Sequence, residues 1–279
     1  MLMKVAIVGL GLMGGSLGLC LRENKLINKV YGFDIDENNA KEALNLGLVD
    51  ELIDFDEAKL AKCDIVVLAT PVDAIVTLLQ KLEKLPQTCT LIELGSTKRK
   101  IVENTPKALQ SHTIYAHPMC GTENSGARAA FKALYDGAVC VLCDSERADD
   151  LHQKRAVEIF SHLRMKIIFM DSISHDHHAA IISHLPHAIS FALANFVMKE
   201  EDKRDIVYLG SSSFKGMSRI AKSSPAMWES IFSQNKSNII QSIEHFQKEL
   251  EFCKQMIEKD DKNALTAWMK AANTLREFL

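Results

Sequence analysis

The sequence has no marked excess of charge of either sign. Its 33 lysine and arginine residues nearly balance its 36 aspartate and glutamate residues, which leaves a net charge of −3. This balance excludes the strongly basic surface by which many proteins bind nucleic acid. A composition of 47% hydrophobic and 25% charged residues also excludes a disordered chain. The 279 residues are enough for a sizeable core and, we expect, for two domains.

The sequence also lacks an apolar run of membrane-spanning length that glycine does not interrupt, so we expect no transmembrane helix. The stretch from Val5 to Leu21 is uncharged and mostly apolar, as a signal peptide is. However, five glycines interrupt it and no small-residue cleavage site follows. We therefore expect a cytoplasmic protein that does not bind membranes.

Cysteine is present, but in no disulfide or zinc-binding pattern. The seven cysteines are an odd number and are scattered from residue 20 to residue 253. Cys140 and Cys143 form one CxxC pair, yet they lie on a strand-like run and no second pair accompanies them. A structural zinc site needs four ligands, so we interpret the cysteines as reduced thiols.

A glycine-rich turn between a strand and a helix is the strongest positive feature. Val5–Val8 is a short β-branched apolar run, typical of a buried parallel strand. Gly9, Gly11 and Gly14 follow it at GxGxxG spacing, and Asp34 ends the next strand-like run. This order of strand, glycines, helix and acidic residue predicts a dinucleotide-binding site. The alternative is a turn that binds nothing.

Each glycine has a physical role in such a site. Gly9 permits a sharp turn, Gly11 lets a pyrophosphate approach the backbone, and Gly14 lets the helix lie close to the strand. The backbone N–H groups at the start of the helix, which include those of Leu12 and Met13, would face the phosphates.

The acidic residue favours NAD over NADP. The carboxylate of Asp34 can accept hydrogen bonds from both ribose hydroxyls, whereas a 2′-phosphate beside it would be repelled. Asp36 and Glu37 add negative charge, and no arginine follows nearby to receive a phosphate.

Strand-like and helix-like runs alternate as far as Asp171. The alternation predicts an α/β fold, in which helices cover both faces of a mostly parallel, doubly wound sheet of the Rossmann type. We place this domain at residues 1–171 and an all-helical domain at residues 172–279. The later predicted strands are residues 63–69, 90–94, 113–116, 139–143 and 166–170.

Polar residues follow several of these strands, where ligands bind in such sheets. Thr70 and Pro71 follow one predicted strand, Ser96 follows another and His117 a third. We expect them to converge with the glycine turn at one edge. His117 is the candidate catalytic base, because a neutral imidazole can accept a hydroxyl proton as hydride leaves. The alternatives are a core or capping histidine and, for Ser96, a helix cap.

The second half indicates helix throughout and is rich in histidine. Five histidines lie between residues 175 and 187, but their spacing matches no common zinc pattern, so we expect no metal. Substrate-binding and structural roles both remain open for them. Pro186 should kink its helix. Residues 210–219 look like a polar loop, in which Arg219 is either a carboxylate-binding residue or a surface arginine.

One long amphipathic helix is predicted after Ser224, where a serine cap precedes Pro225. Apolar residues recur at steps of three and four as far as Ile257, with Asn235 as a polar interruption. A helix of this length spans roughly 50 Å, more than one small domain needs. We therefore expect it to pack against a second subunit in a homodimer; the alternative is a helix that folds back on its own domain.

Together, the motifs of this chain resemble those of the prephenate dehydrogenase family, in its short form without an appended regulatory domain. The resemblance runs through nearly the whole chain, and the order and spacing of the motifs are specific. The motifs are Val8–Ser16 (VGLGLMGGS), Ala69–Val72 (ATPV), Gly95–Lys98 (GSTK), His117–Glu123 (HPMCGTE), His175–Asp176 (HD), Ser183–His187 (SHLPH) and Phe214–Arg219 (FKGMSR).

The resemblance implies an NAD-dependent oxidative decarboxylation of prephenate to 4-hydroxyphenylpyruvate, in tyrosine biosynthesis. It also implies that His117 accepts the proton of the ring hydroxyl, and that Ser96 holds this hydroxyl, orients His117 and borders the cofactor. Arg219 would bind a substrate carboxylate. The other implied substrate-site residues are His187, Ser183, Thr122, Glu123 as a gating partner, and Lys215 from the neighbouring subunit.

Two positions depart from the family pattern. Cys120 replaces a usual alanine, and Gly216 replaces a common acidic residue. The second departure leaves open an arogenate or dual cyclohexadienyl dehydrogenase. Another β-hydroxyacid dehydrogenase would need a catalytic lysine, which Ser183–His187 does not supply. A non-catalytic NAD-binding dimer would leave Ser96, His117 and Arg219 without a role.

Overall fold

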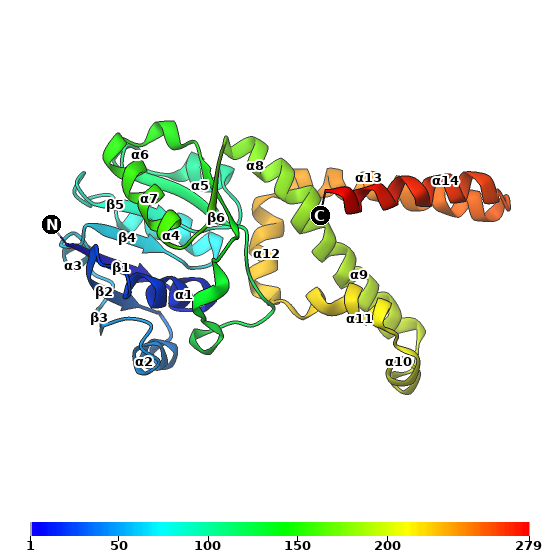
Figure 1. Cartoon of the computed structure of the whole chain (residues 1–279), viewed down its shortest axis with the longest axis horizontal. Coiled ribbons are helices and arrows are strands. Elements are labelled where there is room, and N and C mark those ends of the chain that lie inside the picture. The colour runs from blue at the N-terminus through cyan, green and yellow to red at the C-terminus, as the bar shows by residue number, and fades with distance from the viewer. Residues whose placement is uncertain (1, 279) are drawn as a thin grey trace.

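A computed structural model describes residues 2–278, so the outermost residue of each predicted domain lies outside the described part. The described chain consists of a sheet with surrounding helices, followed by a helical half (Figure 1). The last strand ends at Met170 and the first helix of the second half begins at Ser172.

The sheet has eight strands in the order β3-β2-β1-β4-β5-β6-β7-β8. Neighbours are parallel from β3 to β6, whereas β7 runs antiparallel to β6 and β8 parallel to β7. The predicted mostly parallel, doubly wound sheet is therefore confirmed. The strands are β1 Met3–Val8, β2 Ile27–Phe33, β3 Glu51–Leu52, β4 Ile65–Leu68, β5 Thr90–Glu93, β6 Thr113–Pro118, β7 Val139–Cys143 and β8 Lys166–Met170.

Alternate side chains of the central strands enter two separate apolar clusters, one on each face of the sheet. In β1, Val5 and Ile7 join the cluster beneath α1 and α7, whereas Ala6 and Val8 join the cluster beneath α4 and α5. Both faces are thus covered. The helices of this half are α1 Leu12–Leu21, α2 Glu37–Asn45, α3 Glu57–Leu60, α4 Val72–Lys81, α5 Arg99–Asn104, α6 Lys107–Gln110 and α7 Asp150–His162.

The helical half begins with one continuous helical run. A π-helical turn, Ala180–His184, joins α8 to α9, and Pro186 lies in the first turn of α9. The proline lacks an N–H, and the widened turn directly precedes it. The helices are α8 Ser172–Ala179, α9 Leu185–Glu200, α10 Lys203–Leu209, α11 Ser212–Ser218, α12 Pro225–Gln234, α13 Lys236–Glu258 and α14 Lys262–Asn273.

Two expectations for this half are wrong. The predicted long helix is divided at Asn235, which ends α12 and precedes α13 with φ −105° and ψ 28°. Its buried side chain donates to the carbonyl of Asp176, a tertiary bond that the apolar period does not reveal. The predicted polar loop at residues 210–219 contains the short helix α11.

A third expectation, that no apolar run could span a membrane, is also wrong by length and hydropathy. The 29-residue run Ser172–Glu200 contains an 18-residue stretch of mean hydropathy 1.4, and 11% of that stretch is buried. Histidine, serine and proline interrupt this run instead of glycine. Its exposed apolar side chains include Ile182 and Phe196, each more than 60% exposed.

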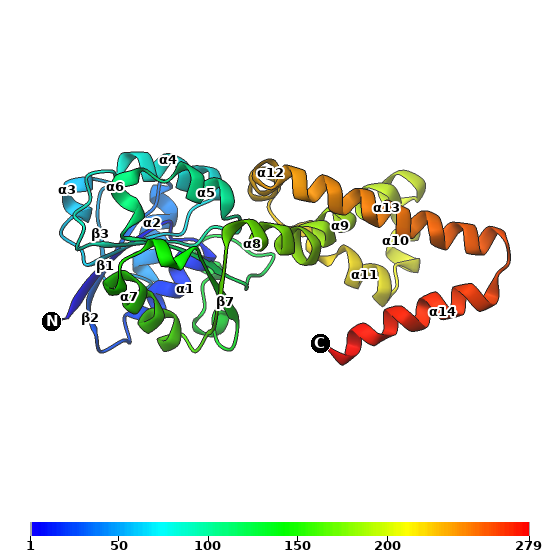
Figure 2. The same ribbon diagram turned by 90° about the horizontal axis from the view of Figure 1, so that it is seen from above.

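The last two long helices form a hairpin that extends away from the sheet and returns (Figures 1 and 2). The described part of α14 has no buried residue, and α13 buries only Ile239, Ser242 and Met256. A helix pair with so little burial leaves much apolar surface in water, which indicates that another surface covers it.

Polar side chains join the two halves. The hydroxyl of Thr97 donates to Gln234 at 2.7 Å, and the amide of Gln234 donates to Asp73 at 2.5 Å. At the start of α8, the N–H and hydroxyl of Ser172 both donate to Asp144. The bonds of Gln234 hold the helical half against the edge of the sheet where the parallel strands end, and those of Ser172 join it to the end of the antiparallel strand β7.

Candidate active site

The glycine turn has the geometry that a phosphate site requires. Gly9 has φ +95°, a conformation that side chains disfavour, and a Cβ on Gly14 would lie 1.9 Å from the carbonyl oxygen of Gly9. By contrast, a Cβ on Gly11 would meet no atom closer than 4.0 Å. The N–H of Gly15 donates to Gly11, so the N–H groups of Leu12, Met13 and Gly14 stay free at the helix start.

Asp34 directly follows the end of β2, and its carboxylate is fixed by three hydrogen bonds. One oxygen accepts the N–H of Leu10 at 2.8 Å and the amide of Asn39 at 2.8 Å, and the other accepts the N–H of Asp36 at 3.0 Å. Beside it, the side chain of Ile35 is 92% exposed. An exposed apolar side chain next to the acidic residue offers a surface for an adenine ring, a feature that sequence reasoning missed.

Thr70 and Pro71 border the same turn. The Cγ2 atom of Thr70 would lie 2.9 Å from a Cβ on Gly9, and the buried hydroxyl of Thr70 has no hydrogen-bond partner in the described chain. An open cradle at Gly11, free N–H groups and an unpartnered hydroxyl are the features that a bound dinucleotide would use. The residues present therefore fit NAD.

His117 lies near the end of β6 and forms a chain of hydrogen bonds with the helical half. Its Nδ1 lies 2.7 Å from Nε2 of His175, and Nδ1 of His175 lies 2.8 Å from Oδ1 of Asp176. The carboxylate of Asp176 also accepts the N–H groups of Lys98 and Arg99 at 2.8 and 3.0 Å. Both residues of the HD motif are therefore part of the site, although the sequence assigns them no role.

This chain of bonds determines which nitrogen of His117 can accept a proton. The carboxylate of Asp176 can only accept, so Nδ1 of His175 carries the hydrogen and its Nε2 does not. His117 must then donate from Nδ1 to that Nε2. Nε2 of His117 is left with a free lone pair, which is the form that a general base requires.

Burial and nearby positive charge keep these histidines neutral. Burial, followed by His175, Lys98 and His184, holds the pKa of His117 well below its usual range. Burial also lowers the pKa of His175, although Asp176 opposes this shift, and lowers that of His184 to about 4. At neutral pH, the imidazole of His117 is therefore in its neutral form.

A buried ion pair supports the strand end that carries His117. The side chains of Lys98 and Glu93 are fully buried and paired, and the ammonium of Lys98 also donates to the carbonyl of Ala116 at 2.7 Å. Ala116 immediately precedes His117, so the pair holds the end of β6 in place. Removing one partner would leave an uncompensated buried charge.

The predicted substrate-binding residues come from both halves. Arg219 of the helical half pairs with Glu123 of the loop after β6 at 3.4 Å. The ring of His187 stacks on Trp228, with centroids 3.7 Å apart, and its Nδ1 bonds to the carbonyl of Ser183 at 3.0 Å. Trp228 is a further residue that the sequence did not single out for this site.

Three predicted site residues make few contacts with the rest of the site. Ser96 is half-buried at the end of β5, and no hydrogen bond joins it to His117 within residues 2–278. Thr122 and Lys215 are exposed, and Thr122 accepts only a local N–H from Asn124. Across the described chain, no group of three histidine, cysteine or acidic side chains has the arrangement of a metal site.

Comparison with known proteins places the chain in a family. Residues 17–169 match the prephenate dehydrogenase nucleotide-binding domain, and residues 171–271 match the prephenate dehydrogenase dimerization domain. The chain is 30% identical to the prephenate dehydrogenase of Bacillus subtilis, over 99% of this chain and 76% of that protein. It belongs to the prephenate dehydrogenase family.

Solved structures of relatives agree with this membership. Prephenate dehydrogenase from Aquifex aeolicus, in complex with hydroxyphenyl propionate and NAD⁺, superposes with a TM-score of 0.91 at 31% identity, over 99% of this chain and 98% of that chain. Arogenate dehydrogenase from Synechocystis superposes with a TM-score of 0.81 at 28% identity, over 99% of both chains. Cyclohexadienyl dehydrogenase from Zymomonas mobilis is 27% identical over 98% of this chain and 94% of its own.

As a member of the prephenate dehydrogenase family, the protein is an NAD-dependent oxidoreductase that acts on a small molecule and forms a dimer. The match of the helical half to a dimerization domain accounts for its exposed apolar surface. The run Ser172–Glu200, which has the hydropathy of a membrane helix, lies within the residues matched to that domain.

Proposed function

We propose that this protein oxidises and decarboxylates prephenate to 4-hydroxyphenylpyruvate, with NAD⁺ as the hydride acceptor. The chain of hydrogen bonds from Asp176 through His175 to His117 carries the proposal. It leaves a neutral imidazole with a free Nε2 at the end of β6, on the sheet edge where the predicted cofactor site also lies. The relatives named prephenate dehydrogenase support the choice of substrate.

The proposed mechanism assigns the proton to Nε2 of His117. That nitrogen would accept the proton of the ring hydroxyl, and bound NAD⁺ would serve as the hydride acceptor. The resulting imidazolium still donates from Nδ1 to His175, and the carboxylate of Asp176 stabilises the positive charge through His175. Loss of the ring carboxylate as CO₂ then makes the ring aromatic. Ser96 would hold the substrate hydroxyl on the cofactor side.

The substrate has two carboxylates, and the site offers cationic and polar groups for them. Arg219 is paired with an exposed carboxylate, Glu123, at 3.4 Å, and a substrate carboxylate would compete for the same guanidinium. We assign the remaining contacts to His187, Ser183 and Thr122. Lys215, which is exposed on α11, would come from the neighbouring subunit, as the resemblance to the family implies.

We further propose that the homodimer forms through the helical half and that the enzyme works in the cytoplasm. Exposed apolar side chains on α9, α13 and α14 support the first proposal, because removing apolar surface from water at an interface favours association. Bacterial relatives that are biosynthetic enzymes support the second. Sedimentation of the purified protein, with Phe196→Asp as the variant and the exposed Lys199→Asp as its control, tests the interface.

Turnover measurements test the reaction. NADH or NADPH formation is followed with prephenate or arogenate, each crossed with NAD⁺ or NADP⁺. Rapid turnover of prephenate with NAD⁺ is expected, and no turnover of either acid would refute the proposal. A preference for arogenate would favour the alternative substrate instead. The relatives with arogenate and cyclohexadienyl activity favour testing it, as does Gly216, where a Cβ would meet no atom within 4 Å.

A further inference from the structure

We propose that Asn39 is a positioning residue that couples the cofactor site to the loop on the substrate side. The loop in question is residues 121–127, which carries Thr122 and Glu123. The proposal rests on the proposed function only in taking Asp34 as the ribose-binding residue and Glu123 as a neighbour of the substrate.

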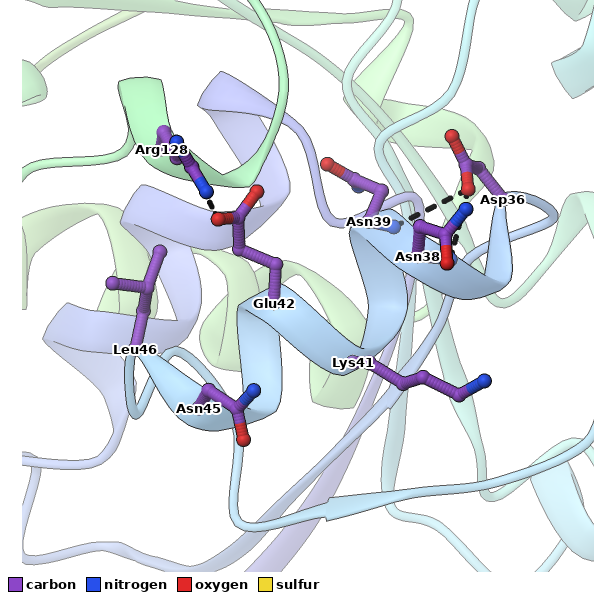
Figure 3. Close-up of a pocket in the computed structure, with 8 residues that line it drawn as sticks. All are labelled: Asp36, Asn38, Asn39, Lys41, Glu42, Asn45, Leu46 and Arg128. Atoms are coloured by element: carbon purple, nitrogen blue, oxygen red, sulfur yellow. Dashed lines mark hydrogen bonds and ion pairs between the residues drawn. The ribbon is translucent and has the colours of Figure 1, made fainter.

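The side chain of Asn39 bridges two parts of the chain. Its amide nitrogen donates to Oδ2 of Asp34 at 2.8 Å, and its amide oxygen accepts the N–H of Ala127 at 2.8 Å. In Figure 3, Asn39 extends from α2 toward the loop segment that carries Arg128, whereas Lys41 extends away from it. One half-buried side chain thus touches both the acidic residue of the cofactor site and the loop.

The orientation of this amide follows from its partners. The carboxylate of Asp34 can only accept a hydrogen bond, and the backbone N–H of Ala127 can only donate one. The nitrogen must therefore face Asp34 and the oxygen must face Ala127. Among the common side chains, a short amide meets both demands at once, whereas a carboxylate or an apolar side chain meets one or neither.

The loop is shaped so that it reaches both Asn39 and the glycine turn. Gly126 has φ +83°, and a Cβ there would lie 3.4 Å from the amide oxygen of Asn39. The backbone nitrogen of Gly126 is also the nearest atom to a Cβ built on Gly11, at 4.0 Å. The loop therefore borders the position at which the pyrophosphate would lie.

Two contacts attach residues 121–127 to other segments of the described chain by hydrogen bonds or ion pairs. One is the bond from Ala127 to Asn39, and the other is the exposed pair of Glu123 with Arg219. An exposed ion pair is a weak restraint. The side chain of Ala127 is also buried in the core of the first half. The bond to Asn39 is therefore the hydrogen bond that links the loop carrying Glu123 directly to the acidic residue of the cofactor site.

This arrangement links the two ligands energetically. A ribose that binds Asp34 fixes the carboxylate, and with it the amide of Asn39 and the loop that carries Glu123. Binding of NAD⁺ should then favour the loop position that the substrate uses. Coupling of this kind is reciprocal, so the substrate analogue must strengthen NAD⁺ binding by the same factor.

The experiment measures binding, with turnover as a separate readout. Isothermal titration gives the Kd of NAD⁺ alone, of hydroxyphenyl propionate alone, and of each in the presence of the other. The variants are Asn39→Ala and Asn39→Asp, with Asn38→Ala as the matched control. Asn38 and Asn39 both line a surface groove of about 470 Å³ (Figure 3). Asn38 bonds to Asp36 through its backbone N–H and not through its side chain.

For Asn39→Ala we expect about a tenfold weaker Kd for NAD⁺, because a bond to a charged group is lost, and a coupling factor close to one. The kcat at saturating ligands should stay near that of the unmodified protein. Asn39→Asp keeps an acceptor for Ala127 but sets a second carboxylate against Asp34. It should weaken NAD⁺ binding further while the Kd of hydroxyphenyl propionate alone stays unchanged.

Equal NAD⁺ affinity and equal coupling in Asn39→Ala and Asn38→Ala would overturn the proposal. A failure of the proposed function would look different, since the unmodified protein would bind NAD⁺ and yet turn over neither acid. If Asn39→Ala does not fold, as judged by circular dichroism, Asn39→Asp decides the question. Unchanged NAD⁺ affinity in that variant contradicts the link to Asp34.

Discussion

The two halves of this prephenate dehydrogenase family member differ in how far one chain completes them. In the first half, the central strands are fully buried, and apolar clusters fill both faces of the sheet. After residue 171, the described chain buries only six apolar side chains, which are Ala179, Ala180, Trp228, Ile231, Ile239 and Met256. The first half therefore has a complete core of its own, whereas the second half leaves most of its apolar side chains for a partner to cover.

The same contrast applies to the chemistry. The first half contains the predicted cofactor cradle, in which the glycine turn and Asp34 lie close together in sequence. The helical half contributes His175 and Asp176, which set the protonation of His117, and Arg219, which faces Glu123. Cofactor binding should therefore survive changes at the junction of the halves, and turnover should not.

The largest effect is expected for His117→Asn. Asparagine cannot accept the hydroxyl proton as a base, so kcat should fall by about 10²–10⁴-fold, the usual contribution of a general base. The Kd of NAD⁺ should barely change, because the glycine turn holds the cofactor. Stopped-flow kinetics and titration measure the two quantities, with the exposed His162→Asn as the control. A near-normal kcat would remove His117 from the mechanism.

Mild acid should lower the free energy of unfolding through the buried histidine His184 of the helical half. The pKa of buried His184 is lowered to about 4, whereas its value in the unfolded chain is about 6.5. Its contribution to stability is therefore complete above pH ~6.5 and is lost as the pH falls toward 4. The loss is about 3 kcal/mol for this group.

Urea unfolding at fixed protein concentration, at neutral and mildly acid pH, measures the effect. His184→Gln should flatten the fall in the free energy of unfolding, because the glutamine does not titrate. His117 and His175 have lowered pKa values and add to the fall in the same direction. The same pH dependence in both proteins would contradict the assignment to His184.

Arg219→Ala should raise the KM for prephenate about tenfold or more, since it removes a charge-assisted contact worth about 2 kcal/mol. The KM for NAD⁺ should change little, because Arg219 belongs to the helical half and the predicted cofactor site to the first half. Steady-state kinetics measure both, and the exposed Arg204→Ala serves as the control. An unchanged KM for prephenate would make Arg219 a surface residue.

The smallest effect is expected at Cys120, in the loop after β6. Burial raises the pKa of this thiol to about 12, so almost none of it is the reactive thiolate at neutral pH. Cys120→Ala should leave kcat nearly unchanged, with a cost in stability of about 1 kcal/mol. Rapid inactivation by iodoacetamide that the Cys120→Ala change prevents would contradict this.

Much of the fold follows from the sequence because its signals are local. The β-branched runs and the alternation of strand and helix predict the sheet, and the spacing of Gly9, Gly11 and Gly14 predicts the cradle. The division of the long helix at Asn235 could not be predicted in this way, because its cause is a bond to the carbonyl of Asp176, which lies 59 residues away. The antiparallel β7 depends likewise on pairing between strands.

The sequence by itself determined the glycine turn, the choice of NAD and the candidate base, since each depends on residue types at short spacing. Only the tertiary structure decided that Nε2 is the free ring nitrogen of His117 and that Asn39 joins Asp34 to the loop. These contacts connect residues 58 and 88 positions apart, and their geometry exists only after the sheet and the helices have packed. Periodicity and propensity describe neighbours along the chain, and the chemistry of this site depends on neighbours in space.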